Sequence, residues 1–331
     1  MSHPVLTQPS TTSLRSHTFH GLEAGPKLLI LGAVHGNEVC GTRAIERLIT
    51  ELDSGRLSLA RGQLTVVPIT NPLAYHRKQR NGDRNLNRNL RPTDAPEDFE
   101  DRIANALCPL LAAHDVLLDL HSFLSQGQAF AMLGPQDNDG ALQPFTQSAL
   151  EEKLVLRLGV GRVVEGWLDT YARGVEKRLA YPDASLRAQM LSTHPSYGVG
   201  TTEYMRAQGG CALTLECGQH EDPAAPEVAY AAIRNALAVL GLLDEPLPPA
   251  QSEVEFLRLE EVIDRLHPED GFAREWKSFD SVREGELIGT RHDGKAVTAP
   301  ADGYIVFPNG KSAPGNEWFY FARPSTRRLR A

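Results

Sequence analysis

Residues 28–34, LLILGAV, constrain the fold of this chain more than any other segment. They form an unbroken apolar run of the length of one strand, and such a run is typical of a strand that is buried on both faces. His35 and Glu38 follow the run directly. Strands buried on both faces belong to parallel sheets covered by helices, so the segment predicts an α/β fold with polar side chains at a strand end.

Strand and helix patterns alternate along the first 245 residues of the 331-residue chain. The expected strands are residues 63–71, 116–122, 128–133 and 211–218, and the expected helices are residues 41–52, 98–114 and 227–243. Residues 72–96 are polar and interrupted by proline and glycine, so we expect a long functional loop there. Residues 192–210 are glycine-rich and are interpreted as irregular. Together these patterns predict a largely parallel sheet that is covered by helices.

A second composition begins after residues 244–252, DEPLPPAQS, which carry three prolines and no helical or strand period. Such a segment is typical of a linker, so we predict two domains, residues 1–245 and residues 253–331. The second part contains short β-type runs separated by turns and predicts a small β-barrel-like domain. Its segments EGELIG, HDGKAV and TAPADGYIVFP resemble a biotinyl/lipoyl-type half-barrel.

Composition and motifs exclude several classes of protein. The formal net charge is −8 with both signs spread along the chain, so the basic surface of a nucleic-acid-binding protein is absent. No apolar run approaches the roughly 18 residues of a membrane span, and no signal peptide is recognisable, so we expect a soluble cytoplasmic protein. The GxSxG, P-loop and GxGxxG motifs are also missing. The cysteines lack a CxxC pair and are interpreted as buried free thiols: Cys40, Cys108, Cys211 and Cys217.

Polar side chains follow three of the expected strands. His35 and Glu38 come after the first, His121 ends VLLDLH, and Glu216 ends CALTLE. In open α/β sheets, ligand sites form at the carboxyl ends of the strands, so these groups are expected to converge. Two imidazoles and one carboxylate that leave a position open are typical of catalytic zinc. Each residue also has a structural alternative, such as a histidine bonded to a backbone carbonyl or a glutamate favoured at a helix start.

Asp119 lies two residues before His121 and therefore on the same face of its strand. One interpretation is that its carboxylate holds the imidazole of a metal ligand in place. The alternative is a partly buried strand carboxylate that pairs with an arginine.

Several motifs together resemble the succinylglutamate desuccinylase and aspartoacylase family. They are HGNE at residues 35–38, Arg80, NLNR at residues 85–88, DLH at residues 119–121 and LEC at residues 215–217. The family shares its fold with the zinc carboxypeptidases, so the resemblance implies a mixed sheet flanked by helices and a small C-terminal β domain that caps the active site. It covers nearly the whole chain.

The resemblance also implies roles at the reacting bond. One zinc ion per chain would be held by His35, Glu38 and His121. Glu216 would be the general base, and Arg80 would polarise the carbonyl of the bond that breaks.

Further matches concern the substrate. Asn87 and Arg88 correspond to the pair that binds a substrate carboxylate, and GNEWFY resembles a family segment that places a substrate-binding tyrosine at Tyr320. Asn85 departs from the pattern, because this position is commonly acidic and one charge beside the metal ligands is therefore expected to be missing. SFLSQG after His121 also departs from the family, so the acyl group and the amino acid are not specified.

We therefore expect a zinc-dependent amidohydrolase that cleaves an N-acyl amino acid, of the N-succinyl or N-acetyl type, to a carboxylate and a free amino acid. Its partners would be small molecules and, in a homo-oligomer, further copies of itself. Two alternatives stay open: a metallocarboxypeptidase acting on short peptides, and a catalytically silent homologue that binds a metabolite. The second predicts loss of the base or of a metal ligand, whereas all four residues are present.

Overall fold

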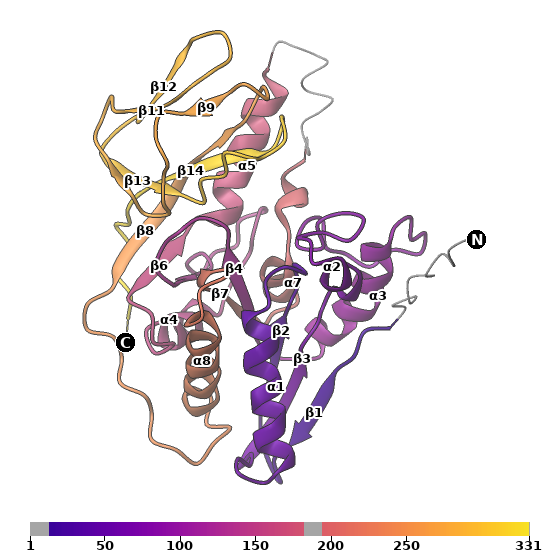
Figure 1. Cartoon of the computed structure of the whole chain (residues 1–331). Coiled ribbons are helices and arrows are strands. Elements are labelled where there is room, and N and C mark those ends of the chain that lie inside the picture. The colour runs from indigo at the N-terminus through magenta and orange to yellow at the C-terminus, as the bar shows by residue number, and fades with distance from the viewer. Residues whose placement is uncertain (1–12, 182–193, 331) are drawn as a thin grey trace, which may run out of the picture.

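The computed structural model describes residues 13–181 and 194–330 (Figure 1). An 11-stranded mixed sheet forms its centre, with the spatial order β1-β3-β2-β4-β7-β5-β6-β8-β14-β13-β10. The strands are β1 His17–His20, β2 Glu23–Gly32, β3 Arg61–Val67, β4 Val116–Phe123, β5 Phe130–Met132, β6 Arg162–Glu165, β7 Cys211–Gln219, β8 Glu255–Asp264, β10 Ser281–Val282, β13 Gly303–Val306 and β14 Glu317–Pro324. Strands β3, β2, β4 and β7 are parallel to one another.

Helices cover both faces of these parallel strands, as the unbroken apolar run predicts. On one face Leu28 and Ile30 pack in a core with α1 (Cys40–Asp53) and α8 (Ala225–Val239), which lie side by side at the front of Figure 1. On the other face Leu29 and Leu31 pack in a core with α3 (Phe99–Ala112). The mixed sheet flanked by helices is therefore confirmed.

Two segments that the sequence analysis treats as irregular contain short helices. Residues 72–96 begin with α2 (Pro72–Arg77), because the Asn71 side chain accepts from the backbone N–H of Ala74 and Pro72 suits the first helical turn. Residues 192–193 lie outside the described residues. Beyond them, the irregular segment contains the 3-10 helix η1 (Pro195–Gly198) and the helix α7 (Thr201–Ala207). Local capping, which composition does not reveal, explains both differences.

Among the described residues up to 245, four other elements were not expected. They are β1, β6, α4 (Ser148–Val155) and α5 (Trp167–Leu179). α4 has eight residues and β1 and β6 have four residues each, so their apolar periods repeat too few times to be recognised. The 13-residue α5 is nearly as long as α1, and its length does not explain why it was missed.

The C-terminal strands continue the main sheet. Strand β8 pairs in parallel with β6, and β14, β13 and β10 follow in antiparallel pairs. A second, three-stranded sheet contains β9 (Gly271–Phe272), β11 (Leu287–Thr290) and β12 (Ala296–Thr298). The expected strands are present, whereas a closed barrel and a division at residues 245–253 stay predictions.

Other expectations from composition concern thiols and membranes. All four cysteines are free and buried, as predicted. Within residues 13–181 and 194–330, no helix has the length and apolar character needed to cross a membrane.

Candidate active site

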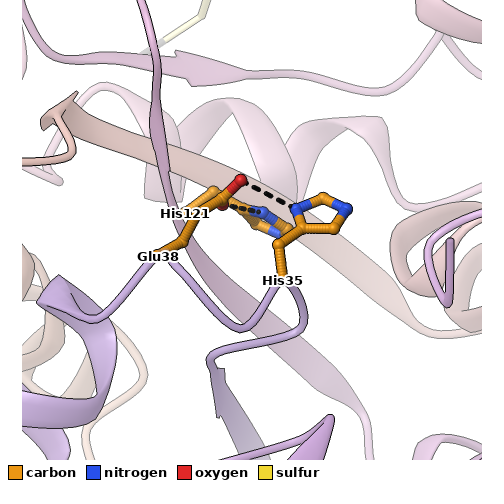
Figure 2. A group of neighbouring side chains, drawn as sticks. All are labelled: His35, Glu38 and His121. Atoms are coloured by element: carbon orange, nitrogen blue, oxygen red, sulfur yellow. Dashed lines mark hydrogen bonds and ion pairs between the residues drawn. The ribbon is translucent and has the colours of Figure 1, made fainter. Parts of the chain in front are cut away.

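Two histidines and one glutamate converge at the carboxyl ends of β2 and β4. The Nδ1 atom of His35 lies 2.9 Å from Oε1 of Glu38, and Nδ1 of His121 lies 2.8 Å from Oε2 of the same carboxylate. Figure 2 shows both imidazoles beside that carboxylate. All three side chains are buried, and one ligand atom from each falls within 4.8 Å of the others.

The backbone of the HGNE segment explains why these residues meet. Ala33 adopts a φ of 47°, which turns the chain at the end of β2. A Cβ atom on Gly36 would lie 2.0 Å from the carbonyl carbon of Ala74, so only glycine allows α2 to pack so closely. The Gly36 N–H also donates to the carbonyl of Arg80. The short turn thereby fixes His35 and Glu38 three residues apart and places Arg80 beside them.

Further polar groups hold the far sides of the imidazoles. Nε2 of His35 lies 3.0 Å from Oδ1 of Asn85, and Nε2 of His121 lies 2.9 Å from Oδ2 of Asp119. Groups in these positions orient metal-binding histidines and fix which ring nitrogen faces the metal. Asn85 therefore supplies a neutral oxygen at a position where the family commonly has an acidic residue. Asp119 contacts His121, as its position on the same face of the strand predicts.

Burial and charge set the protonation of the three groups. Burial, followed by the charge of Arg80, lowers the pKa of His35 to about 4, so this imidazole is neutral and able to bind a metal. Burial by itself would raise the pKa of Glu38, but the two histidines lower it well below its usual value. For His121 the effect of burial is the opposite, because burial by itself would lower the pKa of an imidazole. The carboxylates of Asp119 and Glu38 outweigh it and raise the pKa of His121 well above its usual value.

The donor set fits a divalent metal ion. Nδ1 of His35 is buried and makes no hydrogen bond among the described residues, although it faces the Glu38 carboxylate at 2.9 Å. The lowered pKa keeps this imidazole neutral, so the contact is not a charged ion pair, and a cation bound between the nitrogen and the carboxylate would satisfy both groups. Two imidazole nitrogens and one carboxylate oxygen are the ligands of catalytic zinc sites.

Glu216 lies on the strand next to His121. The two residues are register partners in the parallel pair β4 and β7, so the parallel register places both at the same level of the sheet. Oε2 of Glu216 is buried without a hydrogen-bond partner among the described residues. Burial, only partly offset by His121, raises the pKa of Glu216 to about 8. The side chain is therefore suited to accept a proton near neutral pH.

One cavity of about 640 Å³ joins these groups to the other residues of interest. Seven of the eight residues proposed from the sequence line it: His35, Arg80, Asn87, Arg88, His121, Glu216 and Tyr320. Glu38 lies directly behind the two imidazoles. Arg80 donates from Nη1 to Oε1 of Glu38 at 2.7 Å, which places its guanidinium beside the three convergent side chains.

Loop residues 85–90 position Asn87 and Arg88 in the cavity. The backbone N–H groups of Asn89 and Leu90 donate to carbonyls of Tyr197 and Val199, which fixes the loop against η1. Oδ1 of Asn87 accepts from the backbone N–H of Thr201 at 2.8 Å, so the side-chain amide retains its NH₂ group as a donor. The guanidinium of Arg88 lies 4.7 Å from the ring of Trp167 and 3.7 Å from Oε1 of Glu317.

Trp167 and Glu317 also line the cavity, although neither was predicted as a site residue. Trp167 belongs to a helix that the sequence did not reveal, and Glu317 was visible only as part of GNEWFY. Burial by itself would raise the pKa of Glu317, but Arg88 and other arginines lower it, so this carboxylate is charged. The hydroxyl of Tyr320 is buried and has no partner among the described residues.

A family model described as the succinylglutamate desuccinylase/aspartoacylase catalytic domain matches residues 24–145. This span contains the three convergent ligands, Arg80 and Arg88. A succinylglutamate desuccinylase of Vibrio cholerae is 26% identical over 336 aligned positions, which cover 95% of this chain and 89% of that protein. The resemblance to the succinylglutamate desuccinylase/aspartoacylase family that the motifs indicate is therefore confirmed. The family consists of deacylases.

Solved structures support the same fold. The succinylglutamate desuccinylase/aspartoacylase from Rhodobacter sphaeroides superposes with a TM-score of 0.68 at 19% identity, over 94% of this chain and 90% of the other. An aspartoacylase family protein from Mesorhizobium loti gives a TM-score of 0.65 at 22% identity, over 95% and 90% of the two chains. The family fold therefore extends through the C-terminal strands and beyond residues 24–145.

Proposed function

We propose that this protein is a zinc-dependent amidohydrolase that cleaves the amide bond of an N-acyl amino acid to a carboxylate and a free amino acid. The observation that carries the proposal is the cavity in which two convergent imidazoles, the unpaired carboxylate of Glu216 and the guanidinium of Arg88 all meet. Such a cavity combines a metal-binding centre, a base and a group that recognises a carboxylate.

His35, Glu38 and His121 would hold the metal through the atoms that already face one another. A bound zinc ion supplies Lewis acidity and acidifies water at neutral pH. Asn85 and Asp119 keep the two imidazoles oriented, so that Nδ1 of each ring faces the shared carboxylate.

Glu216 is the proposed general base. Its carboxylate takes one proton from the attacking water and passes it to the amide nitrogen as the C–N bond breaks. The hydroxide part of the water then belongs to the product carboxylate, and the nitrogen leaves as an amine. The pKa of about 8 that burial gives Glu216 suits this double role, because the group both accepts and releases a proton near neutral pH.

Arg80 is proposed to stabilise the oxygen of the scissile carbonyl as negative charge develops on it. Its side chain is 48% exposed, lines the cavity and already contacts Glu38. Removing one such donor typically raises the barrier by about 2.7 to 4 kcal/mol.

Arg88, with Asn87 and Tyr320, is proposed to bind the carboxylate of the amino acid. The 3.7 Å contact with Glu317 is an ion pair too long for a hydrogen bond, so donors of the Arg88 guanidinium remain for a ligand. A planar guanidinium pairs with a carboxylate through two parallel hydrogen bonds. Tyr320 would add its unpaired hydroxyl as a further donor.

The C-terminal part is proposed to be a second domain that narrows the entrance. Phe307, Pro308 and Asn309 come from this part and line the cavity together with Tyr320. A wall at this place would exclude long peptides and favour small substrates, which separates a deacylase from a carboxypeptidase.

The test is incubation of zinc-loaded protein with a pool of N-acetyl, N-succinyl and N-formyl amino acids mixed with short peptides, followed by mass spectrometry. Release of a free amino acid from an acylated substrate is the expected result. His35→Ala serves as the blank, because it removes a metal ligand. Shortened peptides would replace the proposal with a carboxypeptidase, and no product from protein with bound zinc would contradict catalysis.

A further inference from the structure

Four aromatic rings form a continuous wall along the cavity. We call Phe123, Phe307, Tyr320 and Trp167 the aromatic wall, and all four line the cavity. Successive ring centroids lie 6.1, 6.2 and 5.5 Å apart in that order. The wall begins two residues after His121 and ends at Trp167, whose ring lies 4.7 Å from the guanidinium of Arg88. It therefore connects the metal-binding end of the cavity with the carboxylate-binding end.

Other neutral side chains extend this apolar surface. Aliphatic groups at the same cavity are Leu124, Met132, Leu133, Pro135 and Leu142. The polar side chains contributed by the loops around them are uncharged: Ser125, Asn138, Gln143 and Asn309. A volume of about 640 Å³ lies within the roughly 300–1,000 Å³ of cavities that bury most of a ligand's surface. Much of a bound substrate would therefore contact neutral groups.

Two of the arginines that line the cavity, Arg206 and Arg258, already have carboxylate partners. Arg206 lies 2.7 Å from Glu151 and 3.5 Å from Glu203. Arg258 lies 2.5 Å from Asp169 and 3.9 Å from Glu165. Arg173 shares Asp169, Arg327 shares Glu165, and Glu152 adds a third carboxylate, so the network around Arg258 holds three arginines and three carboxylates. Neither Arg206 nor Arg258 therefore leaves a net positive charge to balance a carboxylate of a substrate.

Two more arginines complete the positive charges that line the cavity. Arg80 contacts the Glu38 carboxylate and has a proposed role at the scissile carbonyl. Arg88 shares its charge with Glu317 and has a proposed role at one carboxylate. No lysine lines the cavity among the described residues. A second or third substrate carboxylate would therefore be taken from water without a free cation, which is costly.

We propose that the substrate carries a single carboxylate, that of the amino acid, and that its acyl group and its side chain are uncharged and apolar. This inference rests on the proposed deacylase function and narrows its substrate class. It separates this chain from its relatives named for succinylglutamate, since N-succinylglutamate has three carboxylates. The aromatic wall and the neutral loops replace charge recognition with apolar contact.

The experiment compares four substrates that have the same shape but different charge. Isocaproyl is the neutral isostere of succinyl, and homoleucine is the neutral isostere of glutamate. All four combinations of these two acyl groups and two amino acids are given to the zinc-loaded protein, and kcat/KM is measured for each. We expect the compound with one carboxylate to exceed N-succinylglutamate by about 10- to 200-fold.

A higher kcat/KM for any compound with two or three carboxylates would overturn the inference and leave the deacylase function standing. No cleavage of any of the four or of the N-acyl amino acid pool described above, with zinc shown to be bound, would overturn the proposed function itself. The two failures are therefore distinguishable.

A variant that adds one positive charge to the cavity sharpens the test. Leu142→Arg adds a cation to the cavity at a side chain that is 41% exposed, so folding is little affected. We expect it to lower kcat/KM for isocaproyl-homoleucine and to raise it for N-succinylglutamate. Leu287→Arg is the matched control, because Leu287 is 45% exposed and does not line the cavity. The quantity compared is the ratio of kcat/KM for N-succinylglutamate to kcat/KM for isocaproyl-homoleucine. An equal change of this ratio in Leu287→Arg would contradict the role of the neutral lining.

Discussion

The two ends of the cavity are built on different principles. At the metal-binding end, strand ends and short turns hold His35, Glu38 and His121, and each imidazole has a polar partner on its far side. At the Arg88 end, a loop meets α5 and β14, which are distant in sequence, and the contacts are aromatic rings and an ion pair. The comparison teaches that the strand ends of the central sheet position the proposed reacting groups, whereas packing between loops, α5 and β14 shapes the surface that a substrate would contact.

The largest expected effect tests the assigned base. Glu216→Gln should lower kcat by about 10²- to 10⁴-fold, because the amide cannot take a proton from water. Zinc content, measured by atomic absorption, should stay the same, since Glu216 is not one of the three convergent ligands. Glu221→Gln is the control, because this exposed glutamate lies outside the cavity. Activity retained by Glu216→Gln would remove Glu216 from the mechanism.

A smaller effect is expected at the other end of the cavity. Arg88→Ala should raise KM by about 10- to 100-fold, because a hydrogen bond to a charged group contributes roughly 1.5 to 3 kcal/mol. Arg88→Lys keeps the charge but loses the planar fork, and should recover only part of this loss. Zinc affinity should be unchanged in both variants. Loss of zinc from Arg88→Lys would show that the two ends are not independent.

The support of His35 by Asn85 predicts a change in metal affinity. Asn85→Ala should weaken zinc binding by about tenfold, because groups that orient a ligand histidine typically contribute 10- to 100-fold. Titration against a competing chelator measures this affinity. Asn85→Asp retains an oxygen acceptor and should bind zinc at least as tightly as the natural protein. Equal affinities in all three proteins would mean that Asn85 only packs against the ring.

The smallest effect concerns stability of the metal-free protein. Burial raises the pKa of Glu216 to about 8, whereas the unfolded chain has the ordinary value near 4.5. A raised pKa favours the folded state below the unfolded value, and this contribution is lost as the pH rises through about 8. Glu216→Gln has no carboxyl group to titrate at this position. The melting temperature of the variant minus that of the natural protein should therefore increase between pH 5 and pH 9. A constant difference across this range would contradict the assigned shift.

Predictions from the sequence were strongest where one pattern served both the fold and the site. The run at residues 28–34 indicated a strand covered on both faces and also the place of His35 and Glu38. Asn85 shows the limit of such reasoning. Its residue type suggested a missing charge. In the structure, however, the backbone brings its amide oxygen to 3.0 Å from Nε2 of His35, where it orients the imidazole as an acidic residue would. Trp167 carried no local signal and Glu317 was visible only within GNEWFY, since the importance of both comes from contact with Arg88.

The sequence alone determined the parallel centre of the sheet, the types of the polar side chains at its strand ends and the resemblance to a deacylase family. These follow from residue types and short spacings, because apolar periodicity and a local turn are properties of neighbouring residues. Only the tertiary structure decided that an aromatic wall joins the two ends of the cavity and that its other arginines are already paired. Those features depend on contacts between segments up to about 230 residues apart, such as Arg88 and Glu317, which no local pattern specifies.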